Sequence, residues 1–409
     1  MFDYLIIGAG VTGITIGRLL QQKGNNRFLI LEKEPEPGGL CRTKKIKGHI
    51  LDIGGGHFLC SIYPEVYKFI FSHLPKENFN YYERVSKIQL GNMTIDYPIE
   101  SNLWQLPLDT QVEYLISAIQ SGEVTGKKEP ENYNQWIRWK LGNAIAENYM
   151  IPYNQKIWGV KPERMDIDWL HKIPCLDSKE ILRSCLVRQS DRKKFPSHAG
   201  FYYPKKGGFQ SIFDSIHKHL QKYVHLNEAV TKLEYQKNHW LINNNYRAKK
   251  IINTAPWSCI YKALGKPKAI SQPIKLLKAN TIVVSLWEEP YNHDWHWLYI
   301  PDFKKERHRE FFINNFCPAS KKGGFFSETN IARWPGPNNQ WSNNKKPIFE
   351  FINEYSYPIA IIGHSQAISN ILNYFEQMHL YGVGRWGQWR YMNMDVCMWQ
   401  AMQLLKRIS

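Results

Sequence analysis

The first 32 residues alternate between apolar runs and a glycine-rich segment in an order that predicts a βαβ unit. Asp3 to Ile7 is a mainly apolar run typical of a buried strand, and Gly8 to Gly13 follows it without a gap. An amphipathic run continues to Leu20, and after a polar break the apolar run from Phe28 to Leu31 ends at Glu32. Apolar runs of this length on both sides of an amphipathic stretch indicate two strands joined by a helix.

The glycines of this unit have the spacing of a dinucleotide-binding turn. Gly8 allows a tight turn, Gly10 lets the backbone approach a pyrophosphate, and Gly13 lets the helix pack closely on the strand. The free N–H groups at the helix N-terminus would face the phosphates, and Glu32 is placed to accept hydrogen bonds from a ribose. An ordinary glycine turn is the alternative, but a strand, a helix and an acidic residue in register favour cofactor binding.

The hydrophobic pattern further along predicts an α/β protein with more than one unit, since 409 residues are too many for one typical core. The expected elements are a strand at 51–53 running into Gly54-Gly55-Gly56-His57, helices between 102 and 173, a strand and glycine turn over 201–209, a helix over 212–220, strands at 230–233, 239–242, 251–256, 281–286 and 297–300, and a helix from about Met394. We expect a discontinuous Rossmann-like domain (1–95, 201–272 and 352–409), a mainly helical substrate domain (96–200) and an antiparallel β-sheet substrate domain (273–351).

The charge and cysteine content limit the classes of partner. Lys and Arg number 53 against 36 acidic residues, a net charge of +17, and the lysine pairs are dispersed along the chain. This favours a solvated basic surface or an anionic ligand over nucleic acid, and it leaves peripheral contact with an anionic membrane surface and homo-oligomerisation open. The seven cysteines include no CxxC pair and no metal-ligand spacing, so we expect reduced thiols and no metal.

The apolar runs are too short for a transmembrane protein. None approaches the roughly 18 consecutive apolar residues that a membrane-spanning helix needs. The first predicted strand begins at the N-terminus and leaves no room for a signal peptide. We therefore expect a cytoplasmic protein.

A second glycine pair follows the predicted ribose-binding acid. Gly38-Gly39-Leu40-Cys41-Arg42 comes directly after Glu32-Lys33-Glu34-Pro35-Glu36-Pro37, an order that resembles the flavin-containing amine oxidase superfamily and implies FAD instead of a nicotinamide. The chain has no GxSxG elbow, zinc motif or Walker lysine. The reactive group is therefore expected to be the flavin itself, with the protein holding a substrate against it.

Five further segments make a more specific resemblance, to the UDP-galactopyranose mutases and especially to their eukaryotic type. They follow the family's order and, with the N-terminal motif, cover nearly the whole chain. The segments are Asp52 to His57, Tyr97-Pro98, Trp136-Ile137 with Tyr149 to Val160, Phe201 to Gly208, and Gly384-Arg385-Trp386-Gly387-Gln388-Trp389-Arg390-Tyr391.

The resemblance implies an activity. In that family reduced FAD attacks the anomeric carbon of a nucleotide sugar through flavin N5 and expels the nucleoside diphosphate, and the opened sugar recloses through a different hydroxyl before the diphosphate returns. The chain is thus expected to interconvert pyranose and furanose forms of a nucleotide-diphosphate sugar for surface polysaccharide synthesis, such as capsule or lipopolysaccharide. Cations and phenols would be needed around the departing diphosphate, because negative charge develops there.

The resemblance also implies site residues, with Arg309 ten positions after Tyr299 as in the family. Catalytic roles fall on His57, Arg309 and Arg385, and substrate contacts on Tyr97, Glu100, Asn154, Trp158, Tyr299, Tyr357 and Tyr391. Cofactor contacts fall on Gly8, Gly10, Thr12, Gly13, Glu32, Lys33, Gly39, Leu40, Gly55, Gly56, His57, Val230, Gly384, Arg385, Met394 and Asp395. Taken singly, the tyrosines also fit half-buried strand aromatics, the arginines solvated side chains, and Asn154 and Trp158 helix packing, so the joint spacing carries the prediction.

Three departures from the family pattern concern the substrate. Glu100 stands where the family has a uracil-reading glutamine, an expected arginine aligns near Lys172 or Ile173, and Asp395 replaces an asparagine. An ionised carboxylate only accepts hydrogen bonds, so Glu100 would suit a base edge that presents donors, such as guanine N1–H and N2–H₂. The nucleotide is therefore hypothesised to differ from UDP.

Two other function classes fit parts of the sequence. A flavin oxidase or desaturase of the amine oxidase or protoporphyrinogen oxidase type shares the glycine motifs, but a site for apolar substrates has little use for paired arginines and tyrosines. A non-catalytic nucleotide-sugar or membrane-surface binding protein that keeps FAD for structure is the third reading. Isomerisation without stoichiometric use of oxygen or reductant would distinguish the mutase from both.

Overall fold

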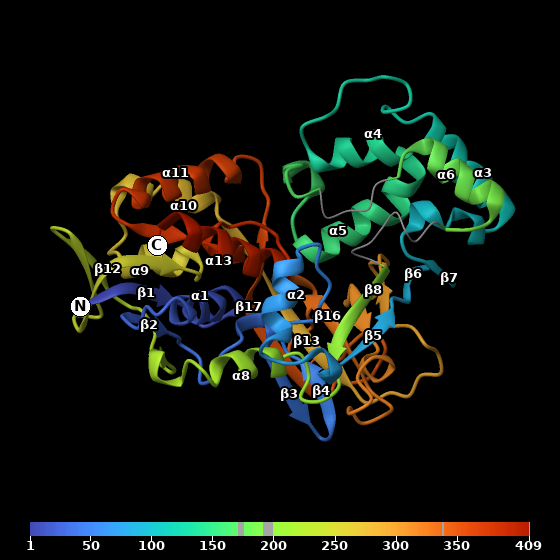
Figure 1. The fold of residues 1–409 in the computed structure, drawn as a ribbon. Helices are drawn as coiled ribbons and strands as arrows, with labels where there is room; N and C mark the ends of the chain where they lie inside the picture. Colours follow the sequence, from blue (N-terminus) through green and yellow to red (C-terminus); the bar gives the residue numbers. More distant parts are fainter. Residues whose placement is uncertain (171–175, 191–198, 338, 409) are drawn as a thin grey trace.

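The computed structural model describes residues 1–170, 176–190, 199–337 and 339–408. Figure 1 shows three regions: a first region with a sheet, flanking helices and both ends of the chain, a second sheet beside it, and a separate group of helices that includes α3 to α6. The candidate site lies where these three regions meet.

The first sheet is built around the N-terminal strand. Its order is β10-β11-β12-β1-β2-β9, and β18 also pairs with β12. β1 pairs in parallel with β2 and β12, whereas the β10–β11–β12 meander is antiparallel. The strands are β1 (Phe2–Ile7), β2 (Phe28–Leu31), β9 (Val224–His225), β10 (Leu233–Gln236), β11 (His239–Ile242), β12 (Tyr246–Asn253) and β18 (Leu380–Gly382).

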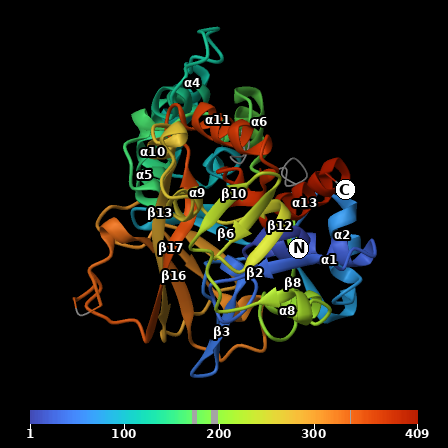
Figure 2. The same ribbon diagram turned by 90° about the vertical axis from the view of Figure 1, so that its left-hand side faces the viewer.

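Helices cover both faces of this sheet, which explains why β2 is buried at all four of its positions and β1 at its last four. Tyr4 and Ile6 pack with α1, α8 and α13, while Leu5 and Ile7 point the other way and pack with α9 and α11. Figure 2 shows these helix groups on opposite sides of β1 and β12. The helices are α1 (Val11–Gln22), α2 (Pro64–Phe71), α8 (Ser211–His217), α9 (Trp257–Ala263), α10 (Pro273–Leu276), α11 (His364–Glu376), α12 (Gly384–Gly387) and α13 (Met394–Ile408).

The second sheet has the order β17-β13-β16-β15-β14-β6-β7. All of its neighbouring strands are antiparallel except β14 and β6. The strands are β6 (Ser86–Leu90), β7 (Met93–Asp96), β13 (Lys278–Trp287), β14 (Trp297–Tyr299), β15 (Arg309–Phe311), β16 (Phe325–Asn330) and β17 (Phe349–Ile359). Two antiparallel pairs complete the described strands: the hairpin of β3 (Thr43–Ile46) and β4 (His49–Asp52), and β5 (Phe79–Glu83) with β8 (Gly200–Pro204), which is distant in sequence.

The helical region packs around its own apolar core. It contains α3 (Leu108–Ile119), α4 (Tyr133–Ile145), a π-helical turn (Ala146–Met150), α5 (Ile151–Trp158) and α6 (Ser178–Val187). α5 has a proline, Pro152, in its first turn and ends at Gly159, whose φ of 66° is the left-handed conformation that stops a helix. This end of α5 meets β16 of the second sheet.

The expected α/β class with a helical insertion and a separate, mainly antiparallel sheet is confirmed. The predicted strand at 230–233 is wrong for three of its residues, because Asn243 Oδ1 accepts hydrogen bonds from the Thr231 and Lys232 N–H groups and β10 begins only at Leu233. The second sheet also recruits β6, β7 and β17, so it extends beyond residues 273–351 at both ends. The division into three residue ranges stays a prediction.

Candidate functional site

The turn between β1 and α1 has the backbone that its glycines predicted. Gly8 has a φ of +99°, and a Cβ on Gly13 would lie 1.9 Å from the Gly8 carbonyl oxygen. A Cβ on Gly10 would have ordinary clearance, 3.8 Å from Gly39 Cα. Gly8 and Gly13 are therefore required by the fold, whereas Gly10 leaves open space in front of the first turn of α1, where backbone N–H groups lack helical partners.

A cavity of about 490 Å³ begins at this turn. Eleven of the predicted cofactor residues line it: Gly8, Gly10, Thr12, Glu32, Lys33, Gly39, Leu40, His57, Val230, Arg385 and Met394. Gly13, Gly55, Gly56, Gly384 and Asp395 do not line it; Gly384, for example, packs against Thr12. The sequence analysis did not assign further lining residues to the cofactor, among them Arg42, Asn353 and Tyr355. Arg42 ends the second glycine motif, whereas Asn353 and Tyr355 lie on β17, which has no glycine motif.

Glu32 lies at the end of β2, as the motif requires. Its Oε2 accepts from the Ala9 N–H at 2.7 Å, and its Oε1 accepts from the Glu34 N–H at 3.0 Å. A carboxylate has about four acceptor positions, so these bonds leave capacity for ribose hydroxyls. The residues around the glycine turn, with an open Gly10 and a fixed acid, fit a dinucleotide.

His57 is a further predicted residue that lines the cavity. Its Nδ1 is 2.8 Å from the Gly55 carbonyl oxygen. Burial lowers the pKa of His57 to about 4, and Arg385 acts in the same direction. The imidazole is therefore neutral at pH 7, and since a carbonyl only accepts, Nδ1 carries the proton and Nε2 is left as an acceptor.

Arg309 is held by a carboxylate that the sequence prediction missed. Arg309 and Glu328 are direct cross-strand partners on β15 and β16, and Arg309 Nε donates to Glu328 Oε2 at 3.1 Å. Burial would raise the pKa of Glu328, but Arg309 and His308 together lower it to about 2. Arg309 Nη2 also donates to the Tyr357 hydroxyl at 3.1 Å. The signal that could have found Glu328 is the polar run Ser327 to Asn330, which follows the apolar Phe325-Phe326 in one strand.

Arg385 lies between the cavity and the tyrosines. It lines the cavity, and its guanidinium carbon is 5.4 Å from the Tyr357 ring centre and 5.9 Å from that of Tyr391. Its Nε and Nη2 donate to the Met392 carbonyl and its Nη1 to the Ser356 carbonyl. These bonds fix the guanidinium plane while leaving N–H groups free for a ligand, since arginine has five.

Tyr299 and Tyr97 form the neighbouring part of the cluster. Their ring centres are 4.8 Å apart, and Tyr299 is the cross-strand partner of Arg309. The Tyr299 hydroxyl accepts from Arg84 Nη2 at 2.6 Å, so its own proton is free for another acceptor. Arg84 is 8% exposed and was not predicted. It lies in the link between β5 and β6, where no motif marks it.

Trp158 brings α5 into this cluster. Its ring lies edge-on to those of Tyr357 and Tyr391, at 5.8 and 5.5 Å between centres. Asn154 is instead bonded within the helical region: its Nδ2 donates to the Tyr133 hydroxyl and the Met150 carbonyl, and its Oδ1 accepts from Trp158 Nε1. A contact between Asn154 and the sugar stays a prediction. In this structure the Asn154 side chain makes the contacts of the alternative interpretation, packing within the helical region.

Glu100 is almost completely buried, at 2% exposure. Among the described residues its Oε1 has no hydrogen-bond partner, and burial raises its pKa to about 8. The carboxyl is therefore mainly protonated at neutral pH, which removes the premise of the guanine hypothesis, an ionised Glu100. A protonated acid can both donate and accept. Lys172 and Ile173, the aligned positions of the missing arginine, lie outside the described residues.

The described parts of the chain contain neither a candidate membrane span nor a candidate metal site. None of the described helices has the length and apolar character needed to cross a bilayer. No group of three or more His, Cys, Asp or Glu side chains there is arranged to hold a metal ion.

Comparisons with known proteins agree with this geometry. Residues 6–72 match the model of an NAD(P)-binding Rossmann-like domain. The chain is 24% identical over 259 residues to a UDP-galactopyranose mutase of Mycoplasma pneumoniae, an alignment that covers 61% of each chain. It is 22% identical over 178 residues to a dTDP-fucopyranose mutase of Escherichia coli, covering 42% of this chain and 46% of that protein. The alignments thus span less than two thirds of these relatives, 61% and 46%.

Solved structures extend the likeness to the whole chain. A reduced UDP-galactopyranose mutase has a TM-score of 0.87 at 22% identity, covering 100% of this chain and 94% of the other. A structure described as a protoporphyrinogen oxidase, from Exiguobacterium sp. 255-15, has a TM-score of 0.74 at 13% identity, covering 100% and 98%. As its motifs predicted, the chain is related in sequence to the UDP-galactopyranose mutases and has their fold.

Proposed function

We propose that this chain is an FAD-dependent mutase that interconverts the pyranose and furanose forms of a nucleotide-diphosphate sugar. The observation that carries the proposal is the position of Arg385, which lines the dinucleotide cavity and also stacks against Tyr357 and Tyr391. A cation at this junction can contact a diphosphate whose sugar lies over the cofactor. The related mutases, whose names specify a UDP-sugar and a dTDP-sugar, support the same substrate class.

The arginines and tyrosines would stabilise the departing diphosphate. Arg309 is bonded to Glu328 and Tyr357, and Arg385 to two backbone carbonyls, so neither guanidinium needs to reorganise when charge develops on the ligand. Planar guanidinium groups bind phosphate oxygens in pairs. The hydroxyl of Tyr299, which accepts from Arg84, keeps a proton to donate. These groups act by binding and orientation.

The cofactor would be FAD in its reduced form. Glu32 and the Gly10 turn fit the ribose and pyrophosphate, and the same cavity continues to His57 and Arg385, a span suited to a dinucleotide. Bound reduced flavin would supply the nucleophilic nitrogen N5 that receives the sugar carbon from the diphosphate. Neutral His57, with Nε2 as an acceptor, would orient a hydroxyl or N–H group beside that position.

The base bound is proposed to be a pyrimidine. A protonated Glu100 offers one donor and one acceptor, the complement of the N3–H and carbonyl pair of uracil or thymine. The names of the related mutases carry uridine and thymidine nucleotides, in line with this choice. A guanine-specific site would need an ionised acid at this position.

A flavin oxidase remains the second candidate, favoured by the structural likeness to a protein described as a protoporphyrinogen oxidase. Such an enzyme acts on a substrate without a diphosphate, and the buried Arg84 and the half-buried Arg309 and Arg385 would then face an apolar ligand. Charged groups around an apolar substrate are costly, so the mutase is the better match to this site.

The test is direct isomerisation. The purified protein is reduced with dithionite under anaerobic conditions and incubated with UDP-galactopyranose, dTDP-fucopyranose and a GDP-sugar, and the products are analysed by chromatography and NMR. We expect a furanose product from a pyrimidine nucleotide sugar, no product from oxidised protein, and FAD in the supernatant after heating. Oxygen-dependent turnover without a furanose product would favour the oxidase. In the cell, we expect the furanose nucleotide to be made in the cytoplasm for surface polysaccharide synthesis.

A further inference from the structure

Lys156, near the end of α5, has an ammonium group that is buried but fully bonded. The side chain is only 1% exposed. Its Nζ donates to the carbonyl oxygens of Ile300, Asp302 and Arg307 at 2.9, 2.7 and 2.8 Å. An ammonium has three N–H donors, and lysine is rarely buried without partners. Three carbonyls therefore match the three donors.

These three carbonyls all belong to the connection between β14 and β15. The strands on either side end and begin at Tyr299 and Arg309, the two residues that this hairpin contributes to the site. Lys156 bonds to the residue directly after Tyr299 and to a residue two positions before Arg309. The ammonium thus fixes both ends of the connection to α5.

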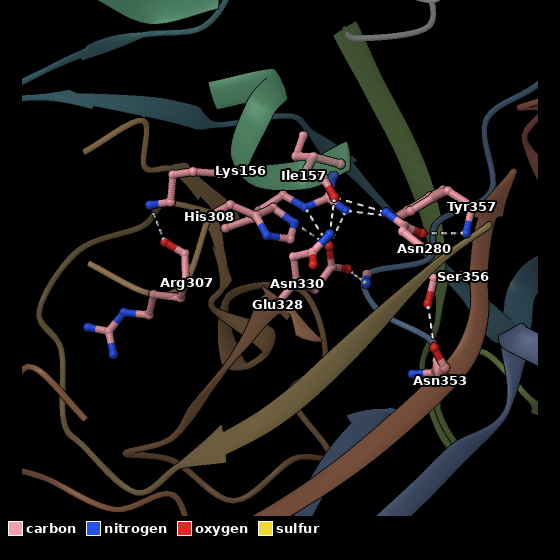
Figure 3. A network of polar contacts seen from close by, with 12 residues as sticks. Lys156, Ile157, Asn280, Arg307, His308, Glu328, Asn330, Asn353, Ser356 and Tyr357 are labelled. Carbon is pink, nitrogen blue, oxygen red and sulfur yellow. Dashed lines mark hydrogen bonds and ion pairs between the residues drawn. The ribbon is translucent and has the colours of Figure 1, made fainter. Parts of the chain in front are cut away.

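The next residue of α5, Ile157, is hydrogen-bonded to strands β13 and β16 of the second sheet. The Ile157 carbonyl accepts from Asn280 Nδ2 at 2.9 Å and from Asn330 Nδ2 at 2.8 Å. The Asn280 Oδ1 accepts from the backbone N–H of Tyr357 at 2.9 Å. Figure 3 shows this network around Ile157, with Lys156 reaching toward Arg307 on the far side.

The contact between α5 and the second sheet is close. A Cβ on Gly159 would lie 3.0 Å from the Asn330 side-chain nitrogen, so only glycine keeps the present approach. On the same helix, Tyr153 and Trp158 lie edge-on to Tyr299 and Tyr357, at 5.4 and 5.8 Å between ring centres. A shift of α5 would therefore change both contacts at once.

We propose that Lys156 is a positioning residue for the nucleotide-sugar site: its ammonium sets the hairpin bearing Tyr299 and Arg309 against α5, while the Ile157 carbonyl sets α5 against Tyr357. The inference rests on the proposed function for the identity of the ligand. The role of Lys156 is a separate proposal. Lys156 is buried and does not line the cavity, yet it would set the spacing between Tyr299, Arg309 and Tyr357.

The surroundings of Lys156 make this role sensitive to pH. The pKa of Lys156 is lowered to about 7, mainly by burial and with help from the charges of Arg333 and Lys305, while Asp302 and Glu306 act in the opposite direction. His308 interacts electrostatically with Lys156, but burial lowers the pKa of His308 to about 4, so it stays neutral across this range. A neutral amine has two N–H donors for three carbonyls. One bond of the clamp is then lost as the pH rises through about 7.

The experiment compares Lys156→Met with Lys304→Met in FAD-loaded protein. Lys304 lies in the same connection with an exposed side chain and serves as the matched control. UDP affinity is measured by isothermal titration calorimetry, with flavin content read from the visible absorbance and turnover from furanose formation. We expect Lys156→Met to weaken UDP binding at least about tenfold, as a misplacement of roughly 1 Å does in enzyme sites, with flavin content unchanged. Lys304→Met should bind UDP as the unmodified chain does.

The outcomes separate the two proposals. If the unmodified chain binds neither UDP nor dTDP, the proposed function fails. If it binds UDP and Lys156→Met binds it within twofold, the positioning role is overturned. Should Lys156→Met not fold, Lys156→Arg decides by its pH profile. Arginine stays protonated, so the loss of affinity near pH 7 that we expect in the unmodified chain should be absent from this variant. A loss of the same size in Lys156→Arg would reject the role.

Discussion

The guanidinium of Arg309 is paired with the carboxylate of Glu328, with Arg309 Nε 3.1 Å from Glu328 Oε2. The other carboxylate oxygen, Oε1, accepts from the backbone N–H of Gly56 at 3.2 Å. Gly56 directly precedes His57, which lines the cofactor cavity. The buried carboxylate of Glu328 therefore holds both Arg309, which is predicted to bind the diphosphate, and the backbone beside His57 in the cavity wall.

We predict that Glu328→Gln lowers kcat/KM for the nucleotide sugar by about 10- to 100-fold, because the amide keeps the shape but no longer fixes the Arg309 charge. Steady-state kinetics on reduced protein would measure the loss. Unchanged kinetics with intact flavin would mean that Arg309 needs no carboxylate. Full removal, in Glu328→Ala, should also destabilise the fold by about 3–5 kcal/mol, since Arg309 is left buried without its partner.

Acid unfolding gives a second test of this pair. The pKa of Glu328 in the folded chain is about 2, below its ordinary value of 4.5, so ionisation of Glu328 stabilises the fold. That contribution is complete above the ordinary value and is lost as the pH falls through about 2. Urea unfolding at a series of pH values measures the free energy of unfolding. Over this window the unmodified chain should lose about 3 kcal/mol more of this free energy than Glu328→Gln does. Parallel curves would contradict the assignment.

Arg309→Ala and Arg385→Ala should differ in their effect on the flavin. Arg309 contacts Glu328 and Tyr357 and does not line the cavity, so its variant should stay yellow while losing about 2–4 kcal/mol of UDP binding. Arg385 lines the cavity, so its variant should lose both UDP affinity and part of the flavin. Calorimetry and the ratio of visible to ultraviolet absorbance measure the two quantities. The double variant Arg309→Ala/Glu328→Gln controls for the carboxylate left unpaired.

Two glycine substitutions should separate cofactor binding from folding. A Cβ on Gly10 has room beside Gly39, so Gly10→Val should fold but block the pyrophosphate and purify without flavin. A Cβ on Gly13 would overlap the Gly8 carbonyl oxygen, so Gly13→Ala should lower the thermal midpoint itself. Circular dichroism melting and flavin absorbance distinguish the cases. Gly10→Val protein with a full complement of FAD would show that the turn is not the cofactor site.

Glu100 should make nucleotide affinity depend on pH in a defined direction. Burial raises its pKa to about 8, so the acid is neutral and can donate below that pH, and it becomes a pure acceptor above it. UDP affinity in the unmodified chain should therefore fall as the pH rises through about 8. Glu100→Gln, which is always neutral, should bind UDP without this step. A preference for GDP that grows above pH 8 would instead restore the guanine hypothesis.

The βαβ unit and much of the cofactor cavity could be predicted from local sequence. Gly8, Gly10, Gly13 and Glu32 lie within 25 consecutive residues, and the strand, turn and helix that carry them form from neighbouring positions. The same holds for the strands at 239–242 and 281–286, whose apolar periods are unambiguous. The strand predicted at 230–233 failed because a side chain 11 to 12 residues away, Asn243, takes the backbone N–H groups.

The order of residues in the chain determined by itself that it has a glycine turn suited to a dinucleotide. It also determined that the arginines and tyrosines have the spacing found in the related mutases. Only the tertiary structure decided that Glu328 neutralises Arg309, that Arg84 reaches Tyr299, that Lys156 caps the β14–β15 connection and that Glu100 is buried enough to hold its proton. The reason is physical: a backbone motif depends on residues that are close in sequence, whereas the charge of a buried side chain depends on the groups that strand pairing and packing bring beside it from distant parts of the chain.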